Sequence, residues 1–186
     1  IVSCEAVILK TDIFFENDKR CVVFSDSFGL ITCLAKHIAK SKRKLWALEP
    51  LSYVNLQLYK GKSFYLINSC NVTTYFSTIR SSFNLLQYSL FFLKIISKSV
   101  MPEQQNIKLY TLLKNILTKC NQLVDINDVK LEFYKLFIEL EGIQPEKELV
   151  YNEKMYLDMI SDYVGYRFKL PLQLDAYSKD CVTLMP

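Results

Sequence analysis

The sequence predicts an α+β fold in which a small closed β-barrel is followed by an α-helical domain. The first 76 of the 186 residues contain five short segments rich in β-forming residues and separated by short turns. After that point apolar residues recur at helical spacing. Hydrophobic residues make up 51% of the chain and charged residues 23%, the balance of a folded globular protein. We therefore expect a barrel domain over residues 1–76 and a helical domain over residues 77–186. No linker pattern separates them, so we expect them to pack rigidly.

Five segments are expected to form the barrel. The stretch Asp26-Ser27-Phe28-Gly29 fits a hairpin turn between the second and third strands, and Gly61-Lys62 turns the fourth strand into the fifth. The expected strands span residues 4–11, 20–25, 30–36, 51–60 and 63–74. Strands this short suit a closed barrel better than a sandwich. The five-stranded OB barrel is the simplest such object, and an SH3-like barrel is the alternative.

Four helices are expected in the second domain. The first begins with Ser77 as N-cap and ends at Met101-Pro102. Asn127 or Asp125 caps the third. The apolar periods cover residues 79–93, 109–120, 129–140 and 155–163, and glycines at 142 and 165 end the last two.

Catalytic and metal chemistry find little support in the sequence. The only histidine, His37, follows Cys33 by four residues, and no third orienting group accompanies them. A thiol enzyme built on this pair is kept as an alternative. The four glycines are too dispersed for a phosphate loop, and the six cysteines contain no CxxC pair. We therefore expect reduced thiols, no metal, no cofactor and no enzymatic activity.

No secretory signal and no unbroken apolar span are visible, so we expect a cytoplasmic protein without a membrane partner.

Positive charge is concentrated in the front of the chain. Residues 1–122 carry a net charge of +9 and residues 123–186 a net charge of −5. Five of the nine residues in the segment 36–44 are Lys or Arg, and Lys60 and Lys62 stand at another strand end. Five phosphate contacts to a single strand predict a salt slope of about −3.5. Four aromatic residues near these cations are candidates for stacking on bases: Tyr53, Tyr59, Phe64 and Tyr65. Together these features predict nucleic-acid binding.

Several motifs resemble those of the RecO family of bacterial recombination mediators. EAVILKT at residues 5–11 is similar to the family's first strand, EAIVLRT, and residues 16–19 resemble its GExD turn, with Phe15 in place of the glycine. Residues 42–51 are similar to KSRLGGALQPF. FYKLFIELEGIQP at residues 133–145 resembles FELRLLALLGYAP. The match runs in order through most of residues 5–145.

The resemblance implies an OB barrel followed by a helical domain that binds single- and double-stranded DNA and anneals complementary strands. It further implies that the protein acts with RecR and the single-stranded DNA-binding protein (SSB) to load RecA in recombinational repair of DNA damage at the nucleoid. The expected DNA track consists of Lys36, His37, Lys40, Lys42, Arg43, Lys44, Lys60, Lys62 and Arg80.

The family's helical domain docks the acidic, Phe-ending C-terminal tail of SSB. The matching segment offers Lys130, Leu131 and Lys135. The family's four-cysteine zinc insert is absent after Pro145, so we expect no zinc. An OB module that binds RNA or a protein, without annealing activity, is the alternative.

Overall fold

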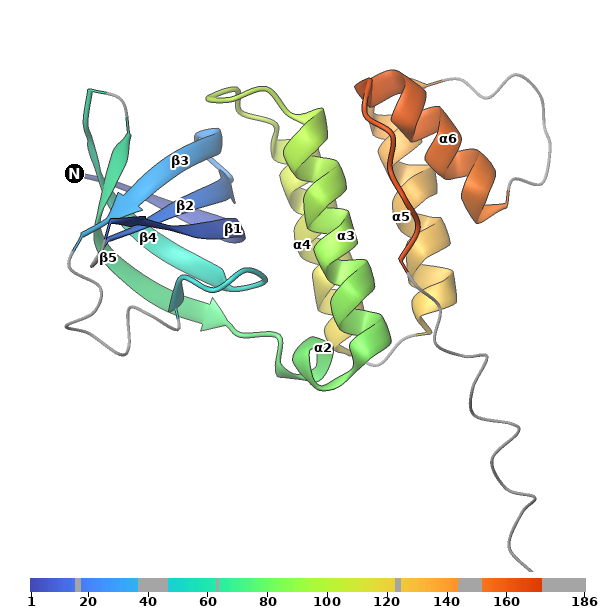
Figure 1. Ribbon diagram of the computed structural model, residues 1–186, viewed down its shortest axis with the longest axis horizontal. Coiled ribbons are helices and arrows are strands. Elements are labelled where there is room, and N and C mark those ends of the chain that lie inside the picture. The colour runs from blue at the N-terminus through green and yellow to red at the C-terminus, as the bar shows by residue number, and fades with distance from the viewer. Residues whose placement is uncertain (16–17, 37–46, 63, 123–124, 144–151, 172–186) are drawn as a thin grey trace, which may run out of the picture.

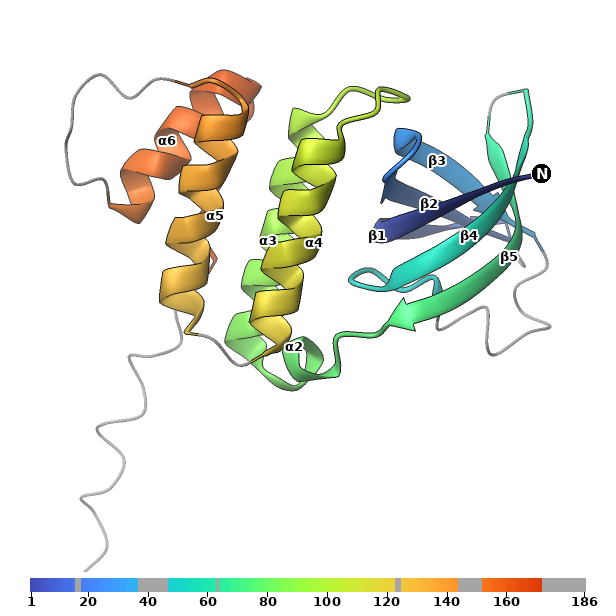
Figure 2. The same ribbon diagram turned by 180° about the vertical axis from the view of Figure 1, so that it is seen from behind.

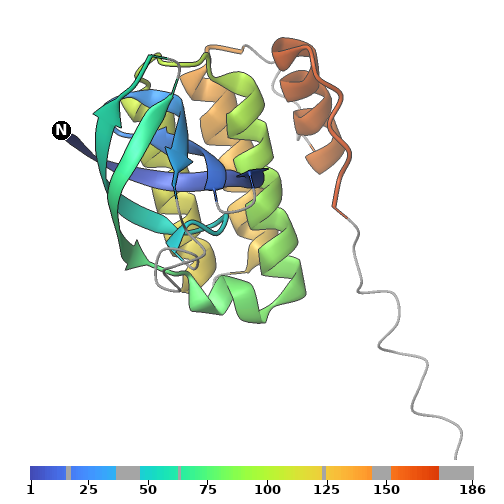
Figure 3. The ribbon, with the colours of Figure 1, turned by 60° about the vertical axis from the view of Figure 1, so that its left-hand side comes forward.

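A computed structural model describes residues 1–15, 18–36, 47–62, 64–122, 125–143 and 152–171. Within these ranges the chain forms a β-barrel with a layered set of helices against one side (Figure 1). Figure 3 shows the barrel in front of the long helices.

The barrel consists of five strands: β1 (Val2–Phe15), β2 (Asp18–Ser25), β3 (Gly29–Ala35), β4 (Tyr53–Lys60) and β5 (Tyr65–Thr74). Their order around the closed sheet is β1-β2-β3-β5-β4, and antiparallel pairing of β1 with β4 closes the circle. The β3–β5 pair is parallel, with Cys33 opposite Tyr65. The predicted hairpin between β2 and β3 is present, with Ser25 opposite Gly29. The predicted five-stranded OB barrel is confirmed.

The middle of strand β1, residues 6–9, is buried on both of its faces. Successive side chains of a strand point to opposite sides. Ala6 and Ile8 therefore enter the barrel core, while Val7 and Leu9 join the core formed with the helices. The barrel and the helical layer thus share apolar contacts directly.

Five helices follow within the described ranges: α2 (Ser77–Ser81), α3 (Phe83–Ser99), α4 (Ile107–Asn121), α5 (Ile126–Leu140) and α6 (Glu153–Val164). Helices α3 and α4 face the barrel, and α5 and α6 lie beyond them (Figures 1 and 2). Strand β5 ends at Thr74 and α2 begins at Ser77, so secondary structure changes at the expected domain boundary. The division into two domains at this point stays a prediction.

The start of the helical domain differs from the sequence prediction. The predicted first helix is broken at Ser82, whose backbone is extended. Ser77 does not cap it, because the N-cap is Phe76, in the left-handed region at φ 50°. Phe76 is buried in the core shared with the barrel. The helix therefore starts at a buried aromatic side chain and not at a serine whose hydroxyl caps the first backbone N–H groups. Further along, Asp125 caps α5 and Gly165 ends α6, as predicted.

The β2–β3 hairpin contacts the α3–α4 connection backbone to backbone. Leu30 O accepts a hydrogen bond from Glu103 N at 2.8 Å. Gly29 has φ +65°, and a Cβ at this position would lie 1.9 Å from Gln104 O. Only glycine fits both this conformation and this approach.

An ion pair joins the barrel to α4 at the same interface. Lys114 Nζ on α4 lies 3.3 Å from Glu5 Oε2 on β1, and Tyr53 OH donates a hydrogen bond to the same carboxylate. The hydrogen bond from Tyr53, followed by the contact with Lys114, lowers the pKa of Glu5. These contacts fix the orientation of the barrel relative to the helices.

Candidate nucleic-acid interface

Two hairpins of the barrel meet through their aromatic side chains. In OB folds, the loops between strands 1 and 2 and between strands 4 and 5 border the oligonucleotide site. Here Phe14, near the end of β1, and Phe64, just before β5, have ring centroids 6.1 Å apart. The β4–β5 hairpin lies away from α3 and α4 (Figure 1). The structure therefore brings the two loops together on a surface that the helices leave open.

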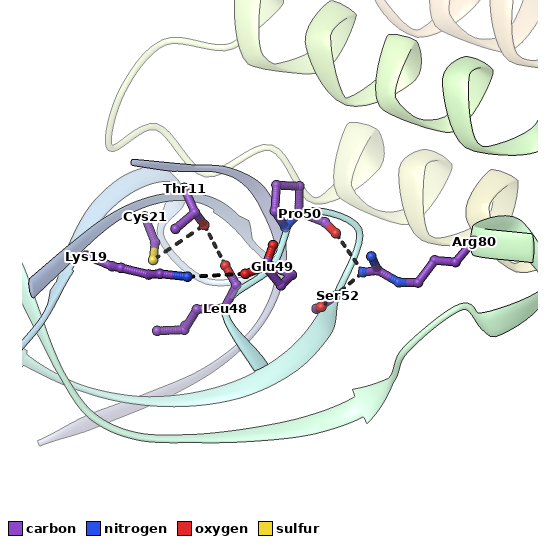
Figure 4. Close-up of polar contacts among 8 residues, drawn as sticks. All are labelled: Thr11, Lys19, Cys21, Leu48, Glu49, Pro50, Ser52 and Arg80. Carbon is purple, nitrogen blue, oxygen red and sulfur yellow. Dashed lines mark hydrogen bonds and ion pairs between the residues drawn. The ribbon is translucent and has the colours of Figure 1, made fainter. Parts of the chain in front are cut away.

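The basic segment begins at the end of β3, beside β2, and the residues after it contact β1 and β2. Exposed Lys36 follows the last residue of β3, which pairs with Lys19 of β2. Beyond the segment, Thr11 Oγ1 donates to Leu48 O at 2.5 Å, and Lys19 Nζ lies 3.2 Å from Glu49 Oε1 (Figure 4). The predicted DNA-binding residues between these anchors lie outside the described residues: His37, Lys40, Lys42, Arg43 and Lys44.

Arg80 occupies the junction between the barrel and α2. Its Nε donates to Tyr75 O at 2.9 Å, and its Nη2 donates to Pro50 O at 2.7 Å and reaches Ser52 Oγ at 3.4 Å (Figure 4). Its guanidinium also lies 4.0 Å from the centroid of the Tyr75 ring. These contacts give Arg80 a role in holding the loop that follows the basic segment. Its contact with DNA stays a prediction.

Lys60 and Lys62 are both exposed at the β4–β5 hairpin. The hairpin is closed by a hydrogen bond from Gly61 N to Phe64 O at 3.0 Å. Both lysines thus lie on this hairpin: Lys62 stands two residues before Phe64, and Lys60 borders a hollow that Tyr65, Glu103 and Gln105 also line. Their position suits phosphate binding, and that role stays a prediction.

The four aromatic candidates divide into two pairs. Tyr59 and Phe64 are exposed. Tyr65 is buried in the barrel core, and Tyr53 is buried in the core shared with the helices. Tyr53 and Tyr59 lie on the same outward face of β4, but the helical layer covers only the end that carries Tyr53. Sequence alternation identified the face but not what covers it.

Sequence reasoning missed three residues of this surface. Phe14 and Phe15 lie at the tip of β1, and the guanidinium of Arg20 on β2 lies 5.9 Å from the Phe14 ring centroid. One signal in the sequence could have pointed to them: Phe15 occupies the position at which the GExD turn motif has glycine.

The thiol alternative finds no support in the surroundings of Cys33. Its side chain is fully buried in the barrel, and burial raises the pKa of the thiol far above its ordinary value. A nucleophilic cysteine needs a lowered pKa and access to substrate. Its proposed partner, His37, lies outside the described residues.

The three predicted tail-binding residues have different environments on α5. Lys130 is buried, with its Nζ 2.6 Å from Glu153 Oε2 of α6 and 3.4 Å from Tyr88 OH of α3. Burial alone would lower the pKa of Lys130, but the hydrogen bond and charge of Glu153 raise it above its ordinary value. Leu131 packs partly against the core, and Lys135 is exposed. The geometry therefore does not favour Lys130 as a cation at the rim of a binding slot.

A groove of about 510 Å³ lies between α4 and α5. Its lining includes Leu112, Ile116 and Leu136, with Lys108 and Lys119 among its polar residues. Lys119 is already paired with Glu132. The groove thus combines an apolar floor with one cation, Lys108, for which the described residues show no ion pair, and Glu139 lines it as well.

Within the described part of the chain, no three His, Cys, Asp or Glu side chains converge as a metal site. Among the helices of the described ranges, none has the length and apolar character needed to cross a membrane.

Comparison with known proteins gives a consistent result. The family model "Recombination protein O N terminal" matches residues 1–76. The DNA repair protein RecO of Clostridium perfringens (strain 13) is 32% identical over 176 residues, which cover 90% of this chain and 69% of the relative. Those of Alkaliphilus metalliredigens and Clostridium novyi (strain NT) are 26% and 28% identical, over 78% and 76% of this chain. The matches cover 60% and 56% of these two relatives, so the chain spans only part of their length.

Proposed function

The chain belongs to the RecO family, and on that premise we propose that it is a recombination mediator in DNA repair. It binds single- and double-stranded DNA and anneals complementary strands. It works with RecR and SSB in the cytoplasm, at the nucleoid, so that RecA is loaded on the DNA. It does this by binding, without catalytic chemistry of its own.

The observation that carries this proposal is the meeting of the two OB loops beside exposed cations. Phe14 and Phe64 are in contact, exposed Lys60 and Lys62 lie on the same hairpin as Phe64, and Lys36 leads into the basic segment. Cations on this surface neutralise phosphates and release counterions, which supplies affinity without sequence preference. Neutralisation also reduces the repulsion between two strands, which is what annealing requires.

We also propose a place for the tail of SSB on the helical domain. An acidic peptide that ends in an apolar side chain needs an apolar slot with a cation nearby. The α4–α5 groove supplies both, through Leu112, Ile116 and Lys108. Lys135 and Leu131, on the same α5 helix, remain candidates beside it. Binding of a labelled acidic peptide ending in Phe, compared between the wild type and Lys108→Glu, tests this assignment.

The DNA interface is tested by salt-dependent binding of a labelled single strand. The double variant Lys60→Ala/Lys62→Ala should weaken binding and reduce the salt slope by about 1.4, because each phosphate that is no longer neutralised lowers the slope by about 0.7. The variant Lys154→Ala/Lys169→Ala is the matched control, because it removes two exposed lysines from α6 and the segment after it. It should leave the slope unchanged.

Annealing of SSB-coated strands tests the mediator activity itself. The wild type should anneal them, and a folded variant with Lys40, Lys42, Arg43 and Lys44 all changed to Ala should not. A wild-type protein that binds no DNA at moderate salt would refute the proposal. Preference for RNA over DNA of the same sequence would favour the alternative OB module instead.

A further inference from the structure

Three phenylalanines and an arginine form a cluster where the two OB loops meet. We propose that Phe14, Phe15 and Phe64, with Arg20 beside them, form a stacking site for unpaired nucleobases. The inference rests on the proposed DNA binding and adds to it. Phosphate contacts alone give a single strand no advantage over a duplex, whose charge density is higher, whereas this cluster selects strands whose bases are unpaired.

The cluster exposes apolar surface that the fold does not use. Phe15 is 65% exposed and Phe64 is 37% exposed, and Ile13, two residues before Phe15, is 80% exposed. Neither core cluster of the molecule contains Phe15 or Phe64. Neighbouring apolar side chains left in water at a loop tip mark an interaction surface.

The rings are arranged so that their flat faces are not stacked on each other. Phe14 meets Phe15 at a centroid distance of 4.6 Å with 76° between the ring planes, and meets Phe64 at 6.1 Å with 65°. These are edge-to-face contacts, which hold the rings in place. Because Phe15 and Phe64 remain exposed in this arrangement, a planar base can pack against them.

Arg20 extends the same platform. Its guanidinium lies 5.9 Å from the Phe14 ring centroid and is held by Asp12 Oδ2 at 3.3 Å. A guanidinium plane stacks on aromatic rings and on bases alike. The cluster therefore offers π-faces and positive charge side by side.

The charge of the surroundings favours nucleic acid over an apolar protein partner as the occupant. Lys62 stands two residues before Phe64, and Lys36 follows the β3 end that lies beside the start of β2. A single strand presents phosphates and open base faces together, so it matches cations interleaved with rings. A duplex hides its base faces in the stack and gains only from the cations.

The test compares three DNA ligands of equal length in a fluorescence-anisotropy titration at one salt concentration. These are an oligothymidylate, an abasic strand with the same phosphates, and a duplex. The wild type should bind the oligothymidylate at least about tenfold more tightly than the abasic strand, as one or two stacked bases would give.

The informative variant is Phe15→Leu/Phe64→Leu, which keeps apolar bulk but removes two π-faces. It should lose about tenfold in affinity for oligothymidylate and keep its affinity for the abasic strand and the duplex. Phe83→Leu is the matched control, because Phe83 is an exposed phenylalanine at the start of α3. Circular dichroism checks folding. Photocrosslinking of wild-type protein to 5-iodouracil DNA, with the adduct mapped to Phe14, Phe15 or Phe64, tests the site even if the variant fails to fold.

The outcomes separate this inference from the function on which it rests. Equal affinity of the wild type for the abasic strand and for oligothymidylate would overturn the stacking site and leave the phosphate interface intact. Absence of binding to all three ligands would overturn both. A variant that keeps wild-type DNA affinity but loses self-association in sedimentation would overturn the stacking site and identify the cluster as a contact between copies of the chain.

Discussion

Replacing Lys130 by methionine should destabilise the helical domain severely, although the substitution keeps the apolar part of the side chain. Lys130 is only 5% exposed. Its Nζ lies 2.6 Å from Glu153 Oε2, and Tyr134 OH donates to the other carboxylate oxygen at 3.3 Å. The substitution therefore leaves a carboxylate without its counterion in a place that water hardly reaches.

The magnitude follows from the distance and the burial. Two unit charges 2.6 Å apart attract by about 6 kcal/mol at an effective dielectric constant of about 20. The cost of desolvating both groups offsets much of this, and removing one partner of a buried pair costs about 3–5 kcal/mol. For a chain of this size that destabilisation corresponds to a fall in Tm of about 6–20 °C.

Urea denaturation followed by circular dichroism at neutral pH measures this destabilisation. In the wild type, the folded-state pKa of Lys130 is raised. Its contribution should therefore be complete below the unfolded pKa of about 10.4 and be lost as the pH rises through the higher folded pKa.

A double variant and a control complete the experiment. Lys130→Met with Glu153→Gln removes both charges while keeping an acceptor for Tyr134, so it should recover most of the stability. About 1 kcal/mol should remain missing, because α6 loses a negative charge from its first turn. Lys135→Met changes an exposed lysine of the same helix and should stay within about 0.5 kcal/mol of the wild type. A destabilisation below about 1 kcal/mol for Lys130→Met, or no recovery in the double variant, would refute the reasoning.

Three further predictions concern the barrel and its junction with the helices. Gly29→Ala should lower the free energy of unfolding, measured by urea denaturation, by at least about 2 kcal/mol, because the backbone is left-handed and the new Cβ clashes with Gln104 O. An unchanged midpoint would show that the α3–α4 connection moves aside without cost. Arg80→Ala should lower the free energy of unfolding by about 2–3 kcal/mol, because it removes three charged hydrogen bonds. The salt slope of DNA binding should stay constant. A slope reduced by about 0.7 would instead show that Arg80 contacts a phosphate. Among the described cysteines of the native protein at pH 8, half-buried Cys70 should react with a disulfide reagent before buried Cys33; rapid labelling of Cys33 would revive the thiol alternative.

Much of the fold was predictable because local signals and packing agree. Alternation in β4, the turn at Gly29 and the caps at Asp125 and Gly165 each depend on residues close in sequence. The break at Ser82 was not predictable in this way. The apolar periodicity of the sequence continues through Ser82, so it gives no sign of the break. The short helix before the break starts after Phe76, which is buried against distant parts of the chain.

The candidate site was less predictable because charge and aromatic character do not show where a side chain points. The sequence pattern around Lys130 predicts a surface lysine on a helix, yet the structure buries it in an ion pair with Glu153 of α6. Tyr53 and Tyr59 read alike on one strand face, yet a helix covers only the first. Phe14 and Phe64 are fifty residues apart, and only closure of the barrel brings their rings together.

Two groups of cations among the described residues have different surroundings. Arg80, Lys114 and Lys130 are engaged with carbonyls or carboxylates at the junctions between elements. Lys60 and Lys62 are exposed on the open side of the barrel. Contributions from distant sites that share no partner add. Combining Lys60→Ala/Lys62→Ala with Lys130→Met should therefore give the stability of the Lys130 variant and the salt slope of the lysine pair, each unchanged by the other. Coupling between the two readouts would mean that the buried ion pair positions the proposed DNA-binding surface through the apolar core that the barrel and the helices share.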